Sequence, residues 1–140
     1  MSGVGRAAAV LALGAGLGLG GCGGVQAADL FLVTREGPAP GQRLVLLVNE
    51  EGGVTCNGHF AGRLDDPKIV ESRAIEEDLE GPASEHLRLP PGPGSVVRYH
   101  VRDADGSVEF SDDSPHQPSA LHKLQLLVLQ AAQQLCRLPG

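Results

Sequence analysis

The sequence is poor in aromatic residues and in positive charge. Its 140 residues include one Tyr, three Phe and no Trp, and 17 Asp and Glu outnumber 11 Lys and Arg, for a formal charge of −6 at pH 7. A chain this short holds one domain, and its acidic balance excludes nucleic-acid binding through bulk positive charge. Because 41% of the residues are hydrophobic and 20% are charged, the composition still indicates a folded chain rather than a fully disordered one.

The sequence also lacks an apolar run long enough to span a membrane, which takes about 20 residues. The uncharged run over residues 7–19 follows Arg6 and has the length of a signal-peptide h-region. It ends in Leu19-Gly20-Gly21-Cys22, which resembles the lipobox of bacterial lipoproteins: an aliphatic residue, two small residues and Cys. The resemblance implies a signal peptide over residues 1–21, lipid attachment at Cys22 and a lipidated tether over residues 22–28.

The alternative is an ordinary secreted protein cleaved after Ala27 or Ala28, because Val25-Gln26-Ala27 loosely fits a signal-peptidase site. A lipidated mature chain would start at Cys22 and hold ten Lys and Arg against 17 Asp and Glu. Acyl chains, rather than this acidic surface, would hold it to lipid. We therefore expect an exported protein anchored at the extracytoplasmic face of the cell membrane.

Two further cysteines, Cys56 and Cys136, lie 80 positions apart. An exported chain can form disulfides, and two cysteines allow one pairing, so we expect a Cys56–Cys136 disulfide. Closing a loop of this length contributes about 4–5 kcal/mol in the chain-entropy model, which helps a small domain with few aromatic residues. The alternative is a catalytic thiol, but Cys56-Asn57-Gly58-His59 matches no nucleophile signature.

Hydrophobic patterning predicts a single α+β domain over residues 29–140. We expect an antiparallel sheet of four to five strands with two helices packed on one face, in the order β-β-β-α-β-β-α. The expected strands are residues 29–35, 43–49, 54–57, 95–102 and 107–111. Asp103-Ala104-Asp105-Gly106 resembles a Ca²⁺ loop in composition, but it lacks the length and the closing Glu of one, so it predicts a hairpin turn.

Both helices are expected from apolar residues at helical spacing. The first should have Asp66 as its N-cap and Pro67 as its first residue, and should end at Gly81-Pro82. Its expected apolar stripe is Ile69, Val70, Ala74, Ile75 and Leu79. The second should run from Pro118 to about Cys136, with a stripe of Leu121, Leu124, Val128, Ala131 and Leu135 widened by Leu127, Leu129 and Ala132.

Motifs that would indicate an enzyme or a metal site are missing from the sequence. It contains no G-x-S-x-G, no phosphate-binding loop and no H-E-x-x-H. Its five His residues have no metal-ligand spacing with cysteine. We expect no catalytic residue, no bound metal and no cofactor.

Two surface features are candidates for binding a partner. The loop Leu89, Pro90, Pro91, Gly92, Pro93, Gly94 is stiff, which lowers the entropy cost of binding. It can equally be a plain connector. Arg98, His100 and Arg102 alternate with apolar residues, so they form a basic row on one strand face. That row is either a contact strip for an acidic partner or a solvated face paired with nearby carboxylates.

Four different short motifs follow one another along most of the expected domain. They are Val33-Thr34-Arg35-Glu36-Gly37, the Gly-containing turn within Val48–Val54, Tyr99–Asp103 with Gly106–Phe110, and Asp113–Pro115 leading to Pro118–Leu121. Their order resembles a type of small, uncharacterised actinobacterial lipoprotein. It is also similar, piece by piece, to emfourin-like proteins, small inhibitors of thermolysin-like metalloproteases. Those inhibitors usually lack a lipobox and this cysteine pair, so the resemblance assigns no inhibitory residue.

These observations together predict a non-enzymatic, lipid-anchored binding or accessory lipoprotein with a protein partner in the envelope or secretome. One alternative is an emfourin-like inhibitor of a secreted metalloprotease. Another is a structural envelope lipoprotein with no soluble target.

Overall fold

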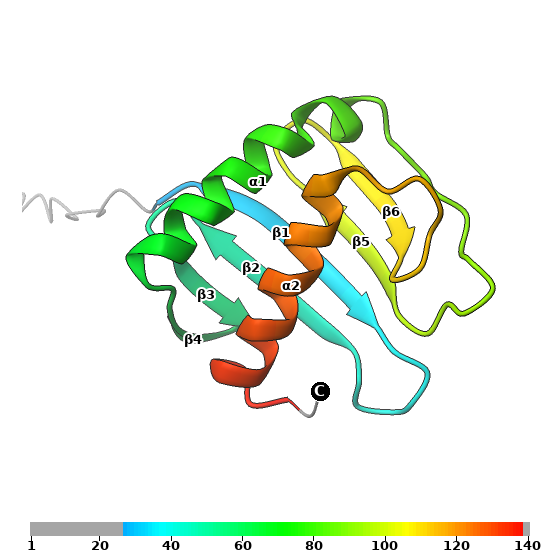
Figure 1. Cartoon of the computed structure of the whole chain (residues 1–140). Helices are drawn as coiled ribbons and strands as arrows, with labels where there is room; N and C mark the ends of the chain where they lie inside the picture. The colour runs from blue at the N-terminus through cyan, green and yellow to red at the C-terminus, as the bar shows by residue number, and fades with distance from the viewer. Residues whose placement is uncertain (1–26, 139–140) are drawn as a thin grey trace, which may run out of the picture.

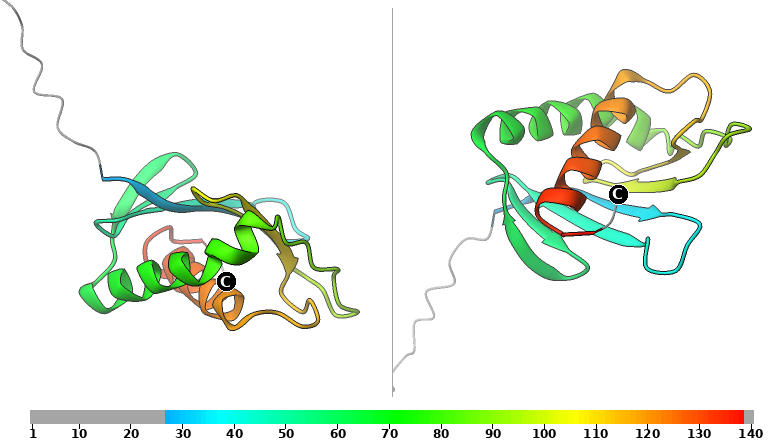
Figure 2. Two further views of the ribbon diagram at one scale, coloured as in Figure 1. Left: turned by 90° about the horizontal axis from the view of Figure 1, so that it is seen from above. Right: turned by 60° about the horizontal axis from the view of Figure 1, so that its bottom comes forward.

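The computed structural model describes residues 27–138, so the signal peptide expected over residues 1–21 and the lipidation expected at Cys22 lie outside the described residues. The elements are β1 (Asp29–Glu36), β2 (Leu44–Asn49), β3 (Gly53–Cys56), β4 (His59–Arg63), α1 (Asp66–Ser84), β5 (Arg98–Arg102), β6 (Ser107–Ser111) and α2 (Ser119–Gln134). They form the expected α+β fold, with both helices on one face of an antiparallel sheet (Figure 1; Figure 2). Neither described helix is long and apolar enough to cross a membrane.

Residues 27–138 contain six strands in the spatial order β4-β3-β2-β1-β5-β6, where four to five strands were expected. The unexpected strand is β4, so the element order is β-β-β-β-α-β-β-α. β4 escapes prediction because Phe60 is its one large apolar residue and Gly62 interrupts any alternation. The sequence signal for this strand was the Asn57-Gly58 pair, which is typical of a tight two-residue hairpin. Both residues adopt the positive φ that such a turn requires.

The core lies between the sheet and the two helices. In β2 burial alternates, with Leu44, Leu46 and Val48 fully buried toward the helices and Val45 and Leu47 partly exposed on the other face. This period of two is what a half-covered sheet imposes on each strand. The helix layer contributes Ile75, Leu79, Leu121, Leu124, Leu127 and Val128.

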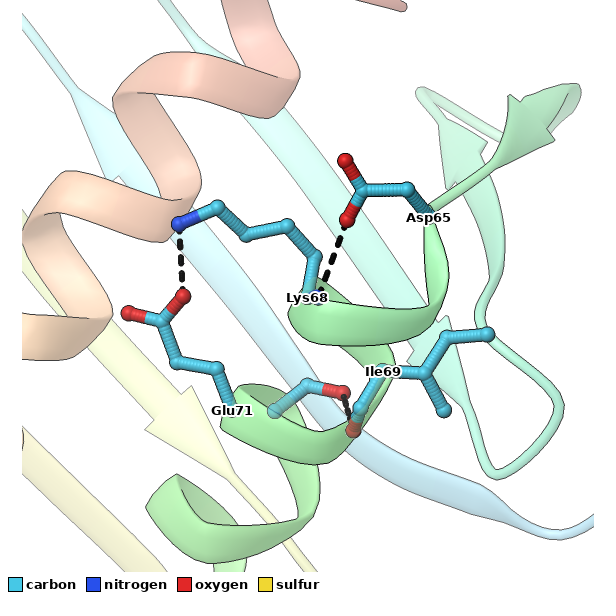
Figure 3. Close-up of polar contacts among 5 residues, drawn as sticks. Asp65, Lys68, Ile69 and Glu71 are labelled. Carbon is cyan, nitrogen blue, oxygen red and sulfur yellow. Dashed lines mark hydrogen bonds and ion pairs between the residues drawn. The ribbon is translucent and has the colours of Figure 1, made fainter.

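Helix α1 begins one residue earlier than expected and ends three residues later. Asp65, not Asp66, is the N-cap, and its carboxylate accepts a hydrogen bond of 3.0 Å from the backbone N–H of Lys68 (Figure 3). Either Asp can cap a helix, and Pro67 is tolerated anywhere in the first turn, so the sequence leaves the position open by one residue. The helix continues through Pro82 to Ser84 because Pro82 removes only one hydrogen bond and Ala83 is buried in the core.

The buried stripe of α1 also differs from the expected one. Val70 is 67% exposed and Ala74 is exposed, whereas Ser72, Ile75, Leu79 and Ala83 are buried. Ser72 fits in the core because its hydroxyl donates to the backbone carbonyl of the residue three positions earlier (Figure 3). A count of apolar residues alone could not place a serine on the buried face.

In α2 the expected stripe is buried at Leu121, Leu124, Val128 and Ala131. Leu129, expected to widen it, is partly exposed instead. Just after this helix, Cys136 forms the expected disulfide with Cys56 of β3, with the two Cα atoms 5.7 Å apart. The bond joins the end of the helix layer to the sheet.

Part of the segment between α1 and β5, which contains the candidate loop Leu89–Gly94, lies against the sheet. The Leu89 N–H donates to the Glu109 carbonyl and the Glu109 N–H donates to the Leu87 carbonyl, both at 2.9 Å. Residues 87–89 therefore pair with β6 in parallel and cover its outer edge. β5 begins at Arg98 rather than at residue 95.

Candidate functional site

The sheet face opposite the helices is covered by no described element (Figure 2), and we call it the bare sheet face. Strand register places Leu32 between Leu47 and Arg102, in one row across this face. The neighbouring row runs from Val45 through Thr34 and His100 to Glu109. The face is therefore apolar at Leu32, Val45 and Leu47, and polar or charged at the end of β1 and over β5 and β6.

A depression of about 420 Å³ lies at one end of the bare sheet face, and we call it the Arg98 groove. β1, β5 and β6 form its floor, and the loop after α1 forms one wall. Its charged side chains and its histidine are Glu36, Arg43, Arg88, Arg98, His100 and Glu109. The groove thus joins the candidate loop and most of the basic row, two features that the sequence shows separately.

Three of the four basic side chains in the groove contact carboxylates. Arg43 Nε lies 3.3 Å from Glu36 Oε1, and Arg88 Nη2 lies 3.5 Å from Glu109 Oε1. His100 Nε2 lies 3.9 Å from the same Glu109 oxygen. These groups are 42–74% exposed, so each pair contributes little stability and can exchange its partner for an incoming charge.

Arg98 differs from its neighbours, because it makes no ion pair with any residue in the described range 27–138. In the strand register it lies between Glu36 of β1 and Ser111 of β6, and its side chain is exposed. Arg102, the other arginine of the expected row, lies at the far end of β5 and borders a separate depression beside Asp29 and Asp103. The basic row is therefore divided between two places.

The candidate loop Leu89–Gly94 is held by one carboxylate from the turn after β6. Asp113 accepts hydrogen bonds from the Gly92 N–H at 3.0 Å and from the Gly94 N–H at 2.6 Å. A Cβ atom on Gly92 would lie 2.3 Å from the Asp113 backbone oxygen, so this close approach requires glycine. Leu89 and Pro91 line the groove, whereas Pro90, Pro93 and Gly94 do not.

An aromatic pair supports the floor of the groove. The rings of Tyr99 and Phe110 stack with their centroids 4.9 Å apart, on adjacent strands. Burial raises the pKa of the Tyr99 phenol, while a hydrogen bond from Arg35 and its charge act in the opposite direction. The pair is a rigid apolar layer beneath a polar surface.

The opposite end of the molecule is acidic. Glu50, Glu76, Glu77 and Glu80, together with one arginine, Arg73, surround Leu30 at the start of β1. Burial first, and then the charges of nearby carboxylates including Asp103, raise the pKa of Glu76. Within residues 27–138, no three His, Cys, Asp or Glu side chains gather in a way that could hold a metal ion.

Sequence reasoning missed Arg43 and Arg88 as groove residues. Arg43 comes from the turn before β2, and Arg88 comes from the segment that pairs with β6. Neither lies in a motif, and only the strand pairing brings them beside Arg98. The remaining expected site residue, Cys22, lies outside the described residues.

The fold and the groove define an α+β domain with an arginine-rich depression on an uncovered sheet face. Comparison with known proteins finds no matching family model, no similar curated protein and no similar solved structure.

Proposed function

We propose that this protein is a non-enzymatic lipoprotein, anchored through Cys22 at the extracytoplasmic face of the membrane, that acts by binding a protein partner. The observation that carries the proposal is the Leu19-Gly20-Gly21-Cys22 sequence directly after a signal-type h-region. The first strand begins at Asp29, which leaves a short tether between the anchor and the domain.

Two structural features support the proposal independently of the lipobox. The Cys56–Cys136 disulfide suits an oxidising, extracytoplasmic compartment. The Arg98 groove is an exposed, polar depression bordered by a tied loop, which suits the binding of a charged partner more than the enclosure of a small substrate.

Anchoring is tested by fractionating cells that express the full chain or its Cys22→Ser variant. We expect the wild type in the membrane fraction, with an intact mass that includes a diacylglyceryl group, and we expect the variant to lose both properties. A Cys22→Ser protein that stays membrane-bound contradicts the anchor. A mature N-terminus at Ala28 or Asp29 would identify the secreted alternative. The Cys56→Ser/Cys136→Ser variant is the matched control, since it removes cysteines without touching the lipobox.

Partner binding is tested by crosslinked pull-down from native envelope and culture medium, with the mature protein attached through residue 22. A partner recovered by the wild type and lost with Arg98→Glu supports an accessory lipoprotein that binds through the groove. Recovery of a secreted metalloprotease would favour the emfourin-like alternative and lead to titration of its activity. No groove-dependent partner in either fraction would favour a structural lipoprotein.

A further inference from the structure

The Arg98 groove concentrates positive charge in an acidic protein. Three of the chain's 11 Lys and Arg residues line it, but only two of its 17 Asp and Glu residues do. The surrounding molecule carries a net negative charge, so a local excess of arginine is a charge pattern that favours an anion at this place.

Arg98 is the cation best placed to receive that anion. Glu36 is engaged by Arg43, and Glu109 is engaged by Arg88 and His100. The Arg98 guanidinium has five N–H donors that match a carboxylate in bidentate geometry, and no described carboxylate pairs with it. The groove therefore offers one strong anion-binding group, Arg98. The basic side chains beside it can exchange their present carboxylate partners for those of a ligand.

Apolar surface next to the groove restricts the class of ligand. Leu89 and Pro91 form part of its wall. Beyond it the bare sheet face continues over Leu32, Leu47 and Thr55 to Phe60, which is 72% exposed. An extended polypeptide can place carboxylates over arginine and aliphatic side chains over this apolar surface, whereas a polyphosphate offers no apolar group for it.

We propose that the Arg98 groove binds an acidic, extended segment of a protein, with one carboxylate of that segment paired to Arg98. The inference deepens the proposed binding function by naming the chemistry of the partner, and it is independent of the lipid anchor. The ion pair forms in partly exposed surroundings, so its contribution depends on the salt concentration.

The test measures binding of a soluble peptide of mixed glutamate and leucine to the chain from residue 22 carrying Cys22→Ser, by titration calorimetry. We expect saturable one-to-one binding that weakens as salt is added. A peptide with glutamine in place of every glutamate should bind about tenfold more weakly or worse, because a charged hydrogen-bonded pair is lost. Equal binding of the two peptides overturns the proposal.

Variants separate the groove from general electrostatics. Arg98→Gln should weaken glutamate-peptide binding about two- to fivefold, whereas Arg137→Gln, which removes the same charge beyond α2, should leave it unchanged. Loss of binding in both variants, or in neither, contradicts the assignment to Arg98. Circular dichroism shows whether each variant is folded.

A poly(glycerol phosphate) sample of similar charge tests the other class of polyanion. Tighter binding of this polymer than of the glutamate peptide would overturn the polypeptide assignment. Failure of the peptide to bind, together with normal membrane anchoring of the full chain, would reject the groove inference while leaving the proposed anchor in place.

Discussion

Glu76 on α1 is the carboxylate whose surroundings most oppose its charge. Burial, followed by Asp103, Asp105, Glu80 and Glu50, raises its pKa above the ordinary value of 4.5. A pKa that is higher in the folded state adds stability below the ordinary value, and this stability is lost as pH rises through the folded pKa. At neutral pH the ionised group therefore destabilises the fold.

We expect Glu76→Gln to raise the free energy of unfolding at neutral pH by about 0.2–0.5 kcal/mol, the size of one like-charge helix pair. The gain should disappear at acid pH, where Glu76 itself is neutral. Urea unfolding across this pH range measures both effects. Glu77→Gln is the control, since Glu77 is exposed on the same helix. A gain for Glu77→Gln as large as for Glu76→Gln, or one independent of pH, would show that this account is wrong.

Asp113 carries the second residue-scale prediction. Replacing it with Ala removes the acceptor for the Gly92 and Gly94 N–H groups. We expect faster hydrogen exchange at both amides and a loss of about 1–3 kcal/mol of stability. Because the tied loop forms one wall of the Arg98 groove, peptide binding should weaken as well.

The matched control for that change is Asp105→Ala, which removes the same charge from a different turn. Its carboxylate accepts no hydrogen bond from any described residue. Unchanged amide exchange at Gly92 and Gly94 in the Asp113→Ala variant would mean that the prolines alone keep the loop in place.

The disulfide between β3 and the end of α2 carries the element-scale prediction. Because it closes a loop of 80 positions, we expect Cys56→Ser/Cys136→Ser to lower the free energy of unfolding by about 2–5 kcal/mol. Urea midpoints measure the change. Reduction of the wild type with dithiothreitol should shift its midpoint to that of the double variant. A double variant as stable as the oxidised wild type would refute this role.

Elements with strong apolar periodicity could be predicted from sequence, and weak ones could not. β6 and α2 follow regular apolar patterns of two or of three and four, since each buries one face against the core, and β1 and β2 contain continuous apolar runs of strand length. β4 lies at the sheet edge, buries little and has no such pattern. The pairing of residues 87–89 with β6 depends on tertiary structure, which no local pattern encodes.

The same limit applies to the candidate site. The stiff loop could be predicted because its residues are contiguous in the sequence. The basic row could be predicted because its residues alternate along one strand. The Arg98 groove was not, because Arg43 and Arg88 reach it from segments on either side of α1. Register across β1, β5 and β6 decides which charges meet, and register is set by the buried face and by turns.

At the scale of the whole molecule, the two ends of β1 differ in charge: glutamates gather at its start, and arginines gather at its end. The strand begins beside Glu50, Glu76 and Glu80 and ends in the Arg98 groove. We expect the glutamate–leucine peptide to bind lipidated protein on anionic vesicles as tightly as it binds the soluble form. The groove lies at the end of β1 farther from the anchor, so it should stay uncovered. Fluorescence anisotropy of a labelled peptide measures both affinities. Weaker binding on vesicles would indicate that the membrane hides the groove.

The position where the described chain enters β1 has a mechanical consequence. Eight residues of strand span about 26 Å, and the groove lies at the end farther from Asp29. With an acyl group on Cys22, the groove would lie at the end of the domain farther from the anchor. Lateral diffusion in the membrane would then confine the search for a partner to two dimensions.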